Sequence, residues 1–169
     1  MERAAKIGAI TMKLRTKVLL FLLALTVATA CNGDRLFEEF RGMQDLQWGV
    51  EDTVSFEVAE VDPNLSPTFI AVRYNDRYEF HNLYVRYLLK DSIGTVLADS
   101  LINVYLFDPK TGKPLGSGYG NVYTKYDELP PLQVAPSDKY RFEFIQYMRT
   151  DTLGGVEAVG LRINKSKVD

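Results

Sequence analysis

The chain contains few of the residues on which catalytic and metal sites usually depend. Its 169 residues include one histidine, His81, and one cysteine, Cys31. A zinc site needs three or four Cys, His or carboxylate ligands, and a Ser-His-Asp relay needs an activated serine, yet no serine lies in a G-x-S-x-G turn. A D-x-D-x-D-G calcium loop is also missing, although carboxylates from separate strands leave a calcium site open as an alternative. We therefore expect no catalytic residues, no metal, no noncovalent cofactor and no enzymatic activity.

A membrane-spanning hydrophobic run and a surplus of positive charge are also missing. The apolar run 18–27 has ten residues, whereas a helix needs about 20 residues to cross the hydrocarbon core of a bilayer. Residues 1–30 contain five of the 20 basic and one of the 22 acidic residues, so the remainder has 15 against 21, a net charge of −6. A surface of that sign repels nucleic acid and anionic lipid head groups. We expect no nucleic-acid partner and no membrane binding through a basic patch.

The run 18–27 has the surroundings of a bacterial secretory signal peptide. Three basic residues precede it, and three small residues separate it from Cys31. Lipoprotein maturation attaches diacylglycerol to a cysteine in this position, although Ala28 stands where the strict lipobox has leucine. We predict that the signal peptide 1–30 is removed, with translation starting as late as Met12, and that Cys31 carries diacylglycerol and acyl chains such as palmitate. Secretion with a free thiol and an uncleaved N-terminal anchor are the alternatives.

The residue after the cysteine bears on the destination of the lipoprotein. Asn32, rather than an aspartate, follows Cys31, which favours export to the outer membrane over retention in the inner membrane. A single acyl chain binds a bilayer only marginally, so the several chains of a mature lipoprotein are needed for a stable anchor. We expect a lipid-anchored protein of the cell envelope, on the periplasmic face of the outer membrane rather than at the cell surface.

Beyond the signal peptide, the sequence predicts one all-β domain. Residues 31–47 are interpreted as a lipidated tether with a lead-in segment, and residues 48–169 as the domain itself. There, β-branched and aromatic residues alternate with turn residues, which is typical of short strands. The strands are expected at 53–58, 68–74, 78–90 with a bulge near residues 81 and 82, 101–107, 122–126, 140–148 and 156–163. Such spacing without an amphipathic helix favours an antiparallel two-sheet β-sandwich of jelly-roll type.

Two sets of residues are candidates for a binding role. Tyr119 lies within a glycine-rich stretch, and Tyr123 and Tyr126 follow it; the three could bind a glycan, although cross-strand packing explains them equally well. Arg149 and Asp151 near the last turn could belong to a surface that binds another protein, or they could be a solvated loop pair. The glycine-rich stretch itself precedes a strand rather than a helix, so it is not a phosphate-binding loop.

Several stretches resemble one known family. They are Cys31, the segment YEFHNLYV at 78–85, the glycine stretch 116–120, and the C-terminal run FIQYMR at 144–149 with DTLGGV and VGLRI after it. With these features the chain resembles the GldH family, the gliding-motility lipoproteins of Bacteroidetes, over most of its length. It departs from the family at Leu115, where members often have an aromatic residue.

The resemblance implies a role in the cell envelope rather than a chemical reaction. It implies a non-enzymatic accessory lipoprotein associated with the gliding-motility and type IX secretion apparatus. The protein would be held to the membrane by its lipid and would act through contacts with other envelope proteins. Only Cys31 acquires a defined role from the resemblance. The second hypothesis from the sequence is a β-sandwich lipoprotein of the outer membrane that binds a glycan or another small ligand.

Overall fold

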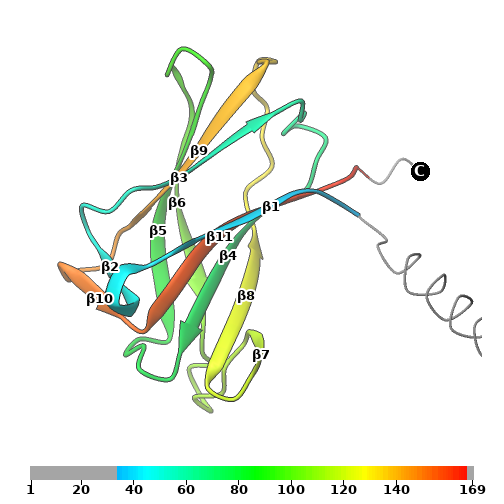
Figure 1. The fold of residues 1–169 in the computed structure, drawn as a ribbon. Helices are drawn as coiled ribbons and strands as arrows, with labels where there is room; N and C mark the ends of the chain where they lie inside the picture. The colour runs from blue at the N-terminus through cyan, green and yellow to red at the C-terminus, as the bar shows by residue number, and fades with distance from the viewer. Residues whose placement is uncertain (1–33, 167–169) are drawn as a thin grey trace, which may run out of the picture. The chain divides into compact units, whose positions relative to one another are not determined.

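A computed structural model describes residues 34–166, and residues Arg35–Asp169 form a compact unit of their own. The described chain consists of β-strands and one 3-10 turn (Figure 1). In chain order these are β1 (Arg35–Gly42), η1 (Gln44–Leu46), β2 (Gln47–Gly49), β3 (Val54–Ala59), β4 (Thr68–Asn75), β5 (Asn82–Lys90), β6 (Val96–Tyr105), β7 (Ser117–Tyr119), β8 (Val122–Glu128), β9 (Lys139–Gln146), β10 (Thr152–Gly154) and β11 (Val156–Asn164). Among the described residues, no helix has the length and apolar character to span a membrane.

The strands form two large antiparallel sheets and one small one. The first sheet has the order β1-β11-β4-β8-β7, the second β3-β9-β5-β6, and β10 pairs with β2. The eight longer strands pair first with last (β1 and β11), second with seventh (β3 and β9), third with sixth (β4 and β8) and fourth with fifth (β5 and β6). Nested pairs of this kind define a jelly roll. The predicted all-β, two-sheet sandwich of jelly-roll type is confirmed.

The alternation of apolar and polar residues explains how the two sheets pack together. In β3, Val54, Phe56 and Val58 are buried while the residues between them are exposed. Successive side chains of a strand point to opposite faces, so one face of the strand enters the core. Aromatic rings fill much of that core: Phe56 lies edge-on to Phe144 at 6.2 Å between ring centroids. Trp48, the one tryptophan of the chain, is fully buried.

The strand predicted at 78–90 is shorter than expected. It begins at Asn82, and the segment 78–81 belongs to the turn after β4, where the Tyr78 amide donates to the Asn75 carbonyl at 3.2 Å. The bulge predicted near residues 81 and 82 is also wrong, because the register of β5 against β6 shifts between Leu89 and Lys90. The bulge was predicted because the alternation of apolar and polar residues shifts near residues 81 and 82. That shift marks the end of this turn instead.

The lead-in segment contains a strand of the sandwich. β1 lies inside the range 31–47 and pairs with β11 along its whole length, with one irregularity between Arg35 and Phe37. It is an edge strand whose residues are exposed or half-buried, so it shows no clean alternation in the sequence. Strand β6 likewise begins at Val96, five residues before the expected start at Leu101.

Candidate interaction surface

An apolar groove lies on the outer face of the β3-β9-β5-β6 sheet, and we call it the Tyr147 groove. Its volume is about 610 Å³, and it is lined by Phe80, Tyr84, Leu101, Tyr147, Met148 and Arg149. Tyr84 comes from β5 and points outward because its neighbours Leu83 and Val85 are buried in the core. Tyr147, Met148 and Arg149 follow directly after β9. Three chain segments therefore supply the groove.

The outer face of this sheet has a polar half and an apolar half. In the polar half, ion pairs join Arg86 to Asp99 and Lys90 to Glu143, each at 2.7 Å between nitrogen and oxygen. The hydrogen bond from Arg86 holds the pKa of Asp99 below its ordinary value. The Tyr147 groove belongs to the apolar half, where neighbouring aromatic and aliphatic side chains remain in contact with water. Contiguous exposed apolar residues of this kind mark interaction sites more often than isolated ones do.

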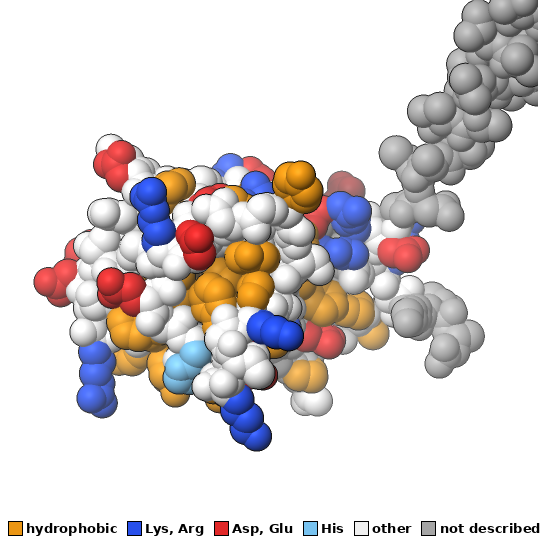
Figure 2. Space-filling model, turned by 90° about the horizontal axis from the view of Figure 1, so that it is seen from below, with side chains coloured by type: hydrophobic (Ala, Val, Ile, Leu, Met, Phe, Trp, Pro, Cys, Tyr) orange, Lys and Arg blue, Asp and Glu red, His pale blue; other side chains and the backbone are white. Residues whose placement is uncertain are grey.

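Figure 2 shows the end of the sandwich where β4 ends and β7 lies. Hydrophobic side chains (orange) gather near the middle of this end, with the histidine side chain (pale blue) at their margin and charged side chains around them. The His81 ring stacks on Tyr105 with 6.0 Å between centroids and 28° between planes. This stacking gives His81 a packing contact with Tyr105.

A buried amide holds the groove residues in place. Gln146 is fully buried, and its side chain accepts a hydrogen bond from the Met148 amide at 2.9 Å and donates one to the Thr150 carbonyl at 2.9 Å. The Tyr147 amide donates to the Tyr84 carbonyl at 2.8 Å. Because buried polar groups are costly to leave unpaired, these bonds keep the loop after β9 in one conformation. The groove is therefore a preformed surface.

The groove adjoins an open sheet edge. β6 pairs with β5 on one side, and no other strand of the described chain pairs with its second side. With ten residues, β6 is the longest strand of the domain. An edge strand presents unpaired N–H and C=O groups to which an extended peptide can add as a further strand. Leu101, which lines the groove, is part of this edge.

The structure separates the two residues proposed from the sequence as an interaction surface. Arg149 and Asp151 are both exposed in the loop between β9 and β10, and no ion pair joins them. Arg149 lines the Tyr147 groove, whereas Asp151 does not, and the Asp151 carbonyl accepts a hydrogen bond from the Val50 amide at 2.8 Å. Of this pair, Arg149 alone lies at the groove.

The three candidate tyrosines do not form a common platform. Tyr119 on β7 is 96% exposed, and no aromatic ring of the described residues stacks on it. The Tyr123 ring packs against the core residue Tyr74 at 5.7 Å, and its hydroxyl donates to the Gly120 carbonyl at 3.1 Å. Tyr126 points to the opposite face of β8, where the Arg162 guanidinium lies 5.3 Å from its ring centroid and its hydroxyl donates to Glu38. No observation favours a glycan site here.

Apart from Arg149, the groove residues were missed by the sequence analysis, although a signal for them exists. In β5 the inward phase is apolar throughout, and Tyr84 is the aromatic residue of the outward phase. In β6, Leu101 lies on the same outward face of the sheet, opposite Arg86 of β5. A large apolar residue on the polar phase of a strand is therefore the pattern that could have indicated this surface. Cys31 lies outside the described residues, which contain no group of three His, Cys, Asp or Glu side chains arranged to hold a metal ion.

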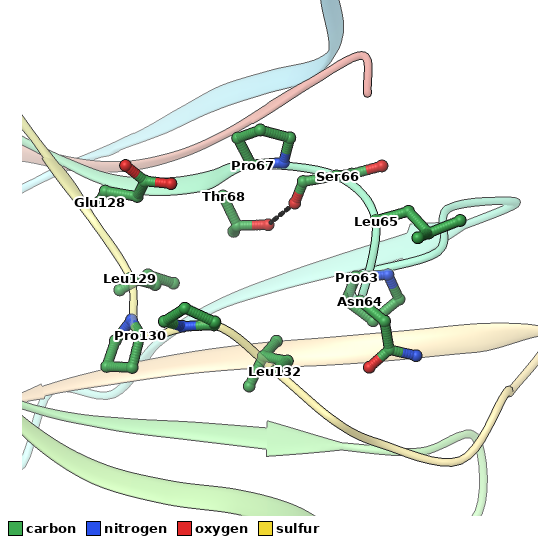
Figure 3. Close-up of a pocket in the computed structure, with 11 residues that line it drawn as sticks. Pro63, Asn64, Leu65, Ser66, Pro67, Thr68, Glu128, Leu129, Pro130 and Leu132 are labelled. Carbon is green, nitrogen blue, oxygen red and sulfur yellow. Dashed lines mark hydrogen bonds between the residues drawn. The ribbon is translucent and has the colours of Figure 1, made fainter. Parts of the chain in front are cut away.

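A smaller pocket lies at the opposite end of the domain, between the loop before β4 and the loop after β8 (Figure 3). Its volume is about 160 Å³, and prolines and leucines of both loops line it. The two loops are joined by Asn64, whose side chain donates to the Val134 carbonyl at 3.0 Å and accepts from the Val134 amide at 2.8 Å. In Figure 3 the Leu65 side chain points away from Leu129 and Leu132.

Comparison with known proteins places the chain among lipoproteins. The sequence profile of a family described as GldH lipoprotein matches residues 35–163. A gliding motility lipoprotein GldH homolog of Christiangramia forsetii is 28% identical over 88% of this chain and 95% of its own length. Gliding motility lipoprotein GldH of Flavobacterium johnsoniae is 25% identical over 86% of this chain and 94% of its own. A chain in the crystal structure of the infectious bursal disease virus VP2 subviral particle superposes at a TM-score of 0.35 and 13% identity over 78% of this chain and 34% of that one.

Proposed function

The chain belongs to the GldH lipoprotein family, and from this premise we propose that it is a non-enzymatic accessory protein of the gliding-motility and type IX secretion apparatus. It is anchored by diacylglycerol and acyl chains on Cys31 to the periplasmic face of the outer membrane. It acts by binding another protein of the envelope. The observation that carries this proposal is the Tyr147 groove beside the open edge of β6.

The physical argument for a protein partner rests on exposed apolar surface. Tyr84, Leu101 and Tyr147 are all exposed, although each is a large side chain whose burial is favourable by about 25 cal/mol per Å² of apolar area. Aromatic residues held in fixed positions contribute strongly to protein interfaces because they bury much area with little loss of conformational freedom. The Gln146 side chain, which accepts from the Met148 amide and donates to the Thr150 carbonyl, holds this surface in place before any partner arrives.

The groove and the edge together favour a partner segment in extended conformation. Such a segment would add to β6 through backbone hydrogen bonds and place alternate side chains over the sheet face. An apolar side chain would enter the groove, and a carboxylate near it would meet Arg149, for which the described residues supply no ion-pair partner. The proposed ligand is thus a strand with an apolar anchor and an acidic neighbour.

Site-specific photo-crosslinking in intact cells tests this proposal. A photoreactive amino acid is placed at Tyr147, and the crosslinked products are identified by mass spectrometry. We expect one dominant envelope protein, whose yield falls at least tenfold when Leu101 is also changed to Asp. Leu115→Asp is the matched control, because Leu115 is comparably exposed (45% against 56%) but does not line the groove. Equal yields from the two variants, or no product at all, would exclude the groove as the docking site.

A further inference from the structure

Three loops lie toward the end of the domain where β1 begins, and we call this end the tether end. β1 starts beside the end of β11, the start of β4 and the end of β8, as the pairs Arg35–Asn164, Ile163–Thr68 and Phe69–Glu128 show. In the other sheet, β3 ends where β9 starts, and β5 ends beside β9. We include in the tether end loops 60–67, 91–95 and 129–138 together with the first residues of β1; in Figure 1 loop 91–95 stands at the top, apart from the start of β1 at the right.

The tips of two of these loops are apolar. Ile93 is 88% exposed and Leu65 is 65% exposed, and they are the two most exposed leucine, isoleucine or valine side chains of the described residues. Leu36 and Val96, at the start of β1 and β6, add further exposed aliphatic surface at the same end. Single exposed apolar residues are ordinary, but the position of the two most exposed ones on loops toward the same end of the domain needs an explanation.

Both tips are held in position by an aspartate that faces the loop backbone. The Asp91 carboxylate accepts hydrogen bonds from the Ile93 amide at 3.0 Å and the Thr95 amide at 2.7 Å. In the other loop, the Asp62 carboxylate accepts from the Asn64 amide at 2.9 Å. These Asx turns direct the negative charge toward the chain and leave Ile93 and Leu65 at the outermost points. The loops thus present apolar tips in a defined conformation.

The length of the chain before β1 limits what the tips can meet. Cys31 precedes Arg35, the first residue of β1, by four residues. An extended chain covers at most about 3.3–3.6 Å per residue, so the first residue of β1 lies within about 14 Å of a lipidated Cys31. An anchor of this length keeps the start of β1 close to the bilayer surface. Lipid is therefore the occupant that the anchor brings nearest to the apolar tips.

We propose that Leu65 and Ile93 insert into the interfacial region of the membrane that holds the lipid anchor, so that the domain stands on its tether end. This proposal rests on the proposed lipidation of Cys31. Apolar tips of this kind bind by burying area among the lipid head groups and the first acyl methylenes. The chain after residue 30 has a net charge of −6, so the contact is apolar rather than electrostatic and depends little on ionic strength.

The proposed orientation has a consequence for the Tyr147 groove. The groove includes Tyr84 near the start of β5 and Leu101 in the middle of β6, whereas loop 91–95 joins the other ends of these strands. Tyr84 lies six residues before the end of β5 and a strand rises about 3.3 Å per residue, so Tyr84 would stand roughly 20 Å from the end of the strand that carries loop 91–95. The tether end would face the membrane while the groove and the edge of β6 remain open to a partner.

Fluorescence depth measurements on the full-length lipidated protein test this orientation. Three variants, Leu65→Cys, Ile93→Cys and the control Leu115→Cys, are labelled with an environment-sensitive fluorophore and reconstituted into phosphatidylcholine vesicles that contain spin-labelled lipid. Acylation of Cys31, the one native cysteine, leaves a single free thiol in each variant. We expect blue-shifted emission and at least threefold stronger quenching at positions 65 and 93 than at 115, unchanged between low and high salt.

The outcomes separate the lipid contact from the anchor. Vesicle-bound protein with equal quenching at all three positions would overturn the contact alone. Stronger quenching of a fourth variant, Leu101→Cys, than of positions 65 and 93 would also overturn it, since the groove would then face the lipid. A chain that does not float with the vesicles and has no acyl mass on Cys31 would overturn both the contact and the proposed anchor.

Discussion

Replacing Tyr87 with phenylalanine should stabilise the domain. Tyr87 is fully buried, and its hydroxyl has no hydrogen-bond partner in the described part of the chain. Its ring lies between two others, with 6.2 Å to the centroid of Phe142 and 5.8 Å to that of Phe144. Burial raises the pKa of Tyr87, so the hydroxyl stays protonated at any ordinary pH. The side chain therefore contributes apolar packing through its ring and an unpaired polar group at its tip.

The size of the effect follows from these contacts. An unsatisfied buried hydroxyl carries a desolvation penalty of about 1–3 kcal/mol, and Tyr87→Phe removes it while keeping the ring. We expect the free energy of unfolding to rise by about 1 kcal/mol. Tyr78→Phe is the matched control: the Tyr78 hydroxyl is also buried but donates to the Asn82 carbonyl at 2.8 Å, so the same substitution should lower stability by about 1 kcal/mol.

Urea unfolding monitored by Trp48 fluorescence measures both changes. Trp48 is the single tryptophan and is fully buried, so its emission reports loss of the core. With a denaturant slope of about 2 kcal/mol per molar urea, a change of about 1 kcal/mol moves the midpoint by about 0.5 M. If Tyr87→Phe lowers the midpoint as Tyr78→Phe does, the Tyr87 hydroxyl has a partner, such as an internal water, and the reasoning is refuted.

Three further changes test other parts of the structure. Gly155→Ala should destabilise the domain by about 2–4 kcal/mol in the same urea assay, because the backbone has φ +78° there and the new Cβ would lie 2.4 Å from a backbone nitrogen. Gly154→Ala is the control: it has open space around it and should destabilise the domain by less than about 1 kcal/mol. Similar losses of stability in the two variants would contradict this geometry. Gln146→Ala should lower stability by about 2 kcal/mol and speed hydrogen exchange in residues 147–150, whereas unchanged exchange would show that the amide does not hold the loop. The Asp108 carboxylate accepts hydrogen bonds from the amide and hydroxyl of a threonine and from a lysine amide, and these bonds hold its pKa below the ordinary value. The contribution of Asp108 to the free energy of unfolding is therefore present above about pH 4 and is lost as the pH falls through the folded-state pKa. Asp108→Asn should make the urea midpoint fall less steeply in acid, and an unchanged fall would show that Asp108 does not contribute to acid unfolding.

The sandwich architecture could be predicted from the sequence because apolar and polar residues alternate along its strands. In β3, β5 and β9 one phase is apolar almost without exception, and a strand can bury such a phase only against a second sheet. The first and last residues of the strands were harder to predict. β1 has half-buried residues on both faces because it is an edge strand, so its sequence has no alternation to detect. The turn before β5 depends on a backbone hydrogen bond between Tyr78 and Asn75, which composition does not show.

The Tyr147 groove could not be predicted from the sequence in the same way. Its residues come from the turn before β5, from β5 and β6, and from the loop after β9, and the proximity of these segments depends on the register that pairs Arg86 with both Leu101 and Ile145. No local pattern specifies a register between strands, because it is the packing of the whole core that selects it. By contrast, Tyr123 and Tyr126 lie three residues apart on β8, so strand alternation alone places them on opposite faces.

The sequence by itself determined the antiparallel sandwich through local apolar alternation, and it predicts an export signal and a lipid at Cys31, both of which lie outside the described residues. Only the tertiary structure decided which apolar residues remain uncovered: the Tyr147 groove on one end and Leu65 with Ile93 on the other. Exposure is a property of the packed domain, because a side chain is buried or free according to which strands and loops cover it, and segments far apart in the chain provide that cover.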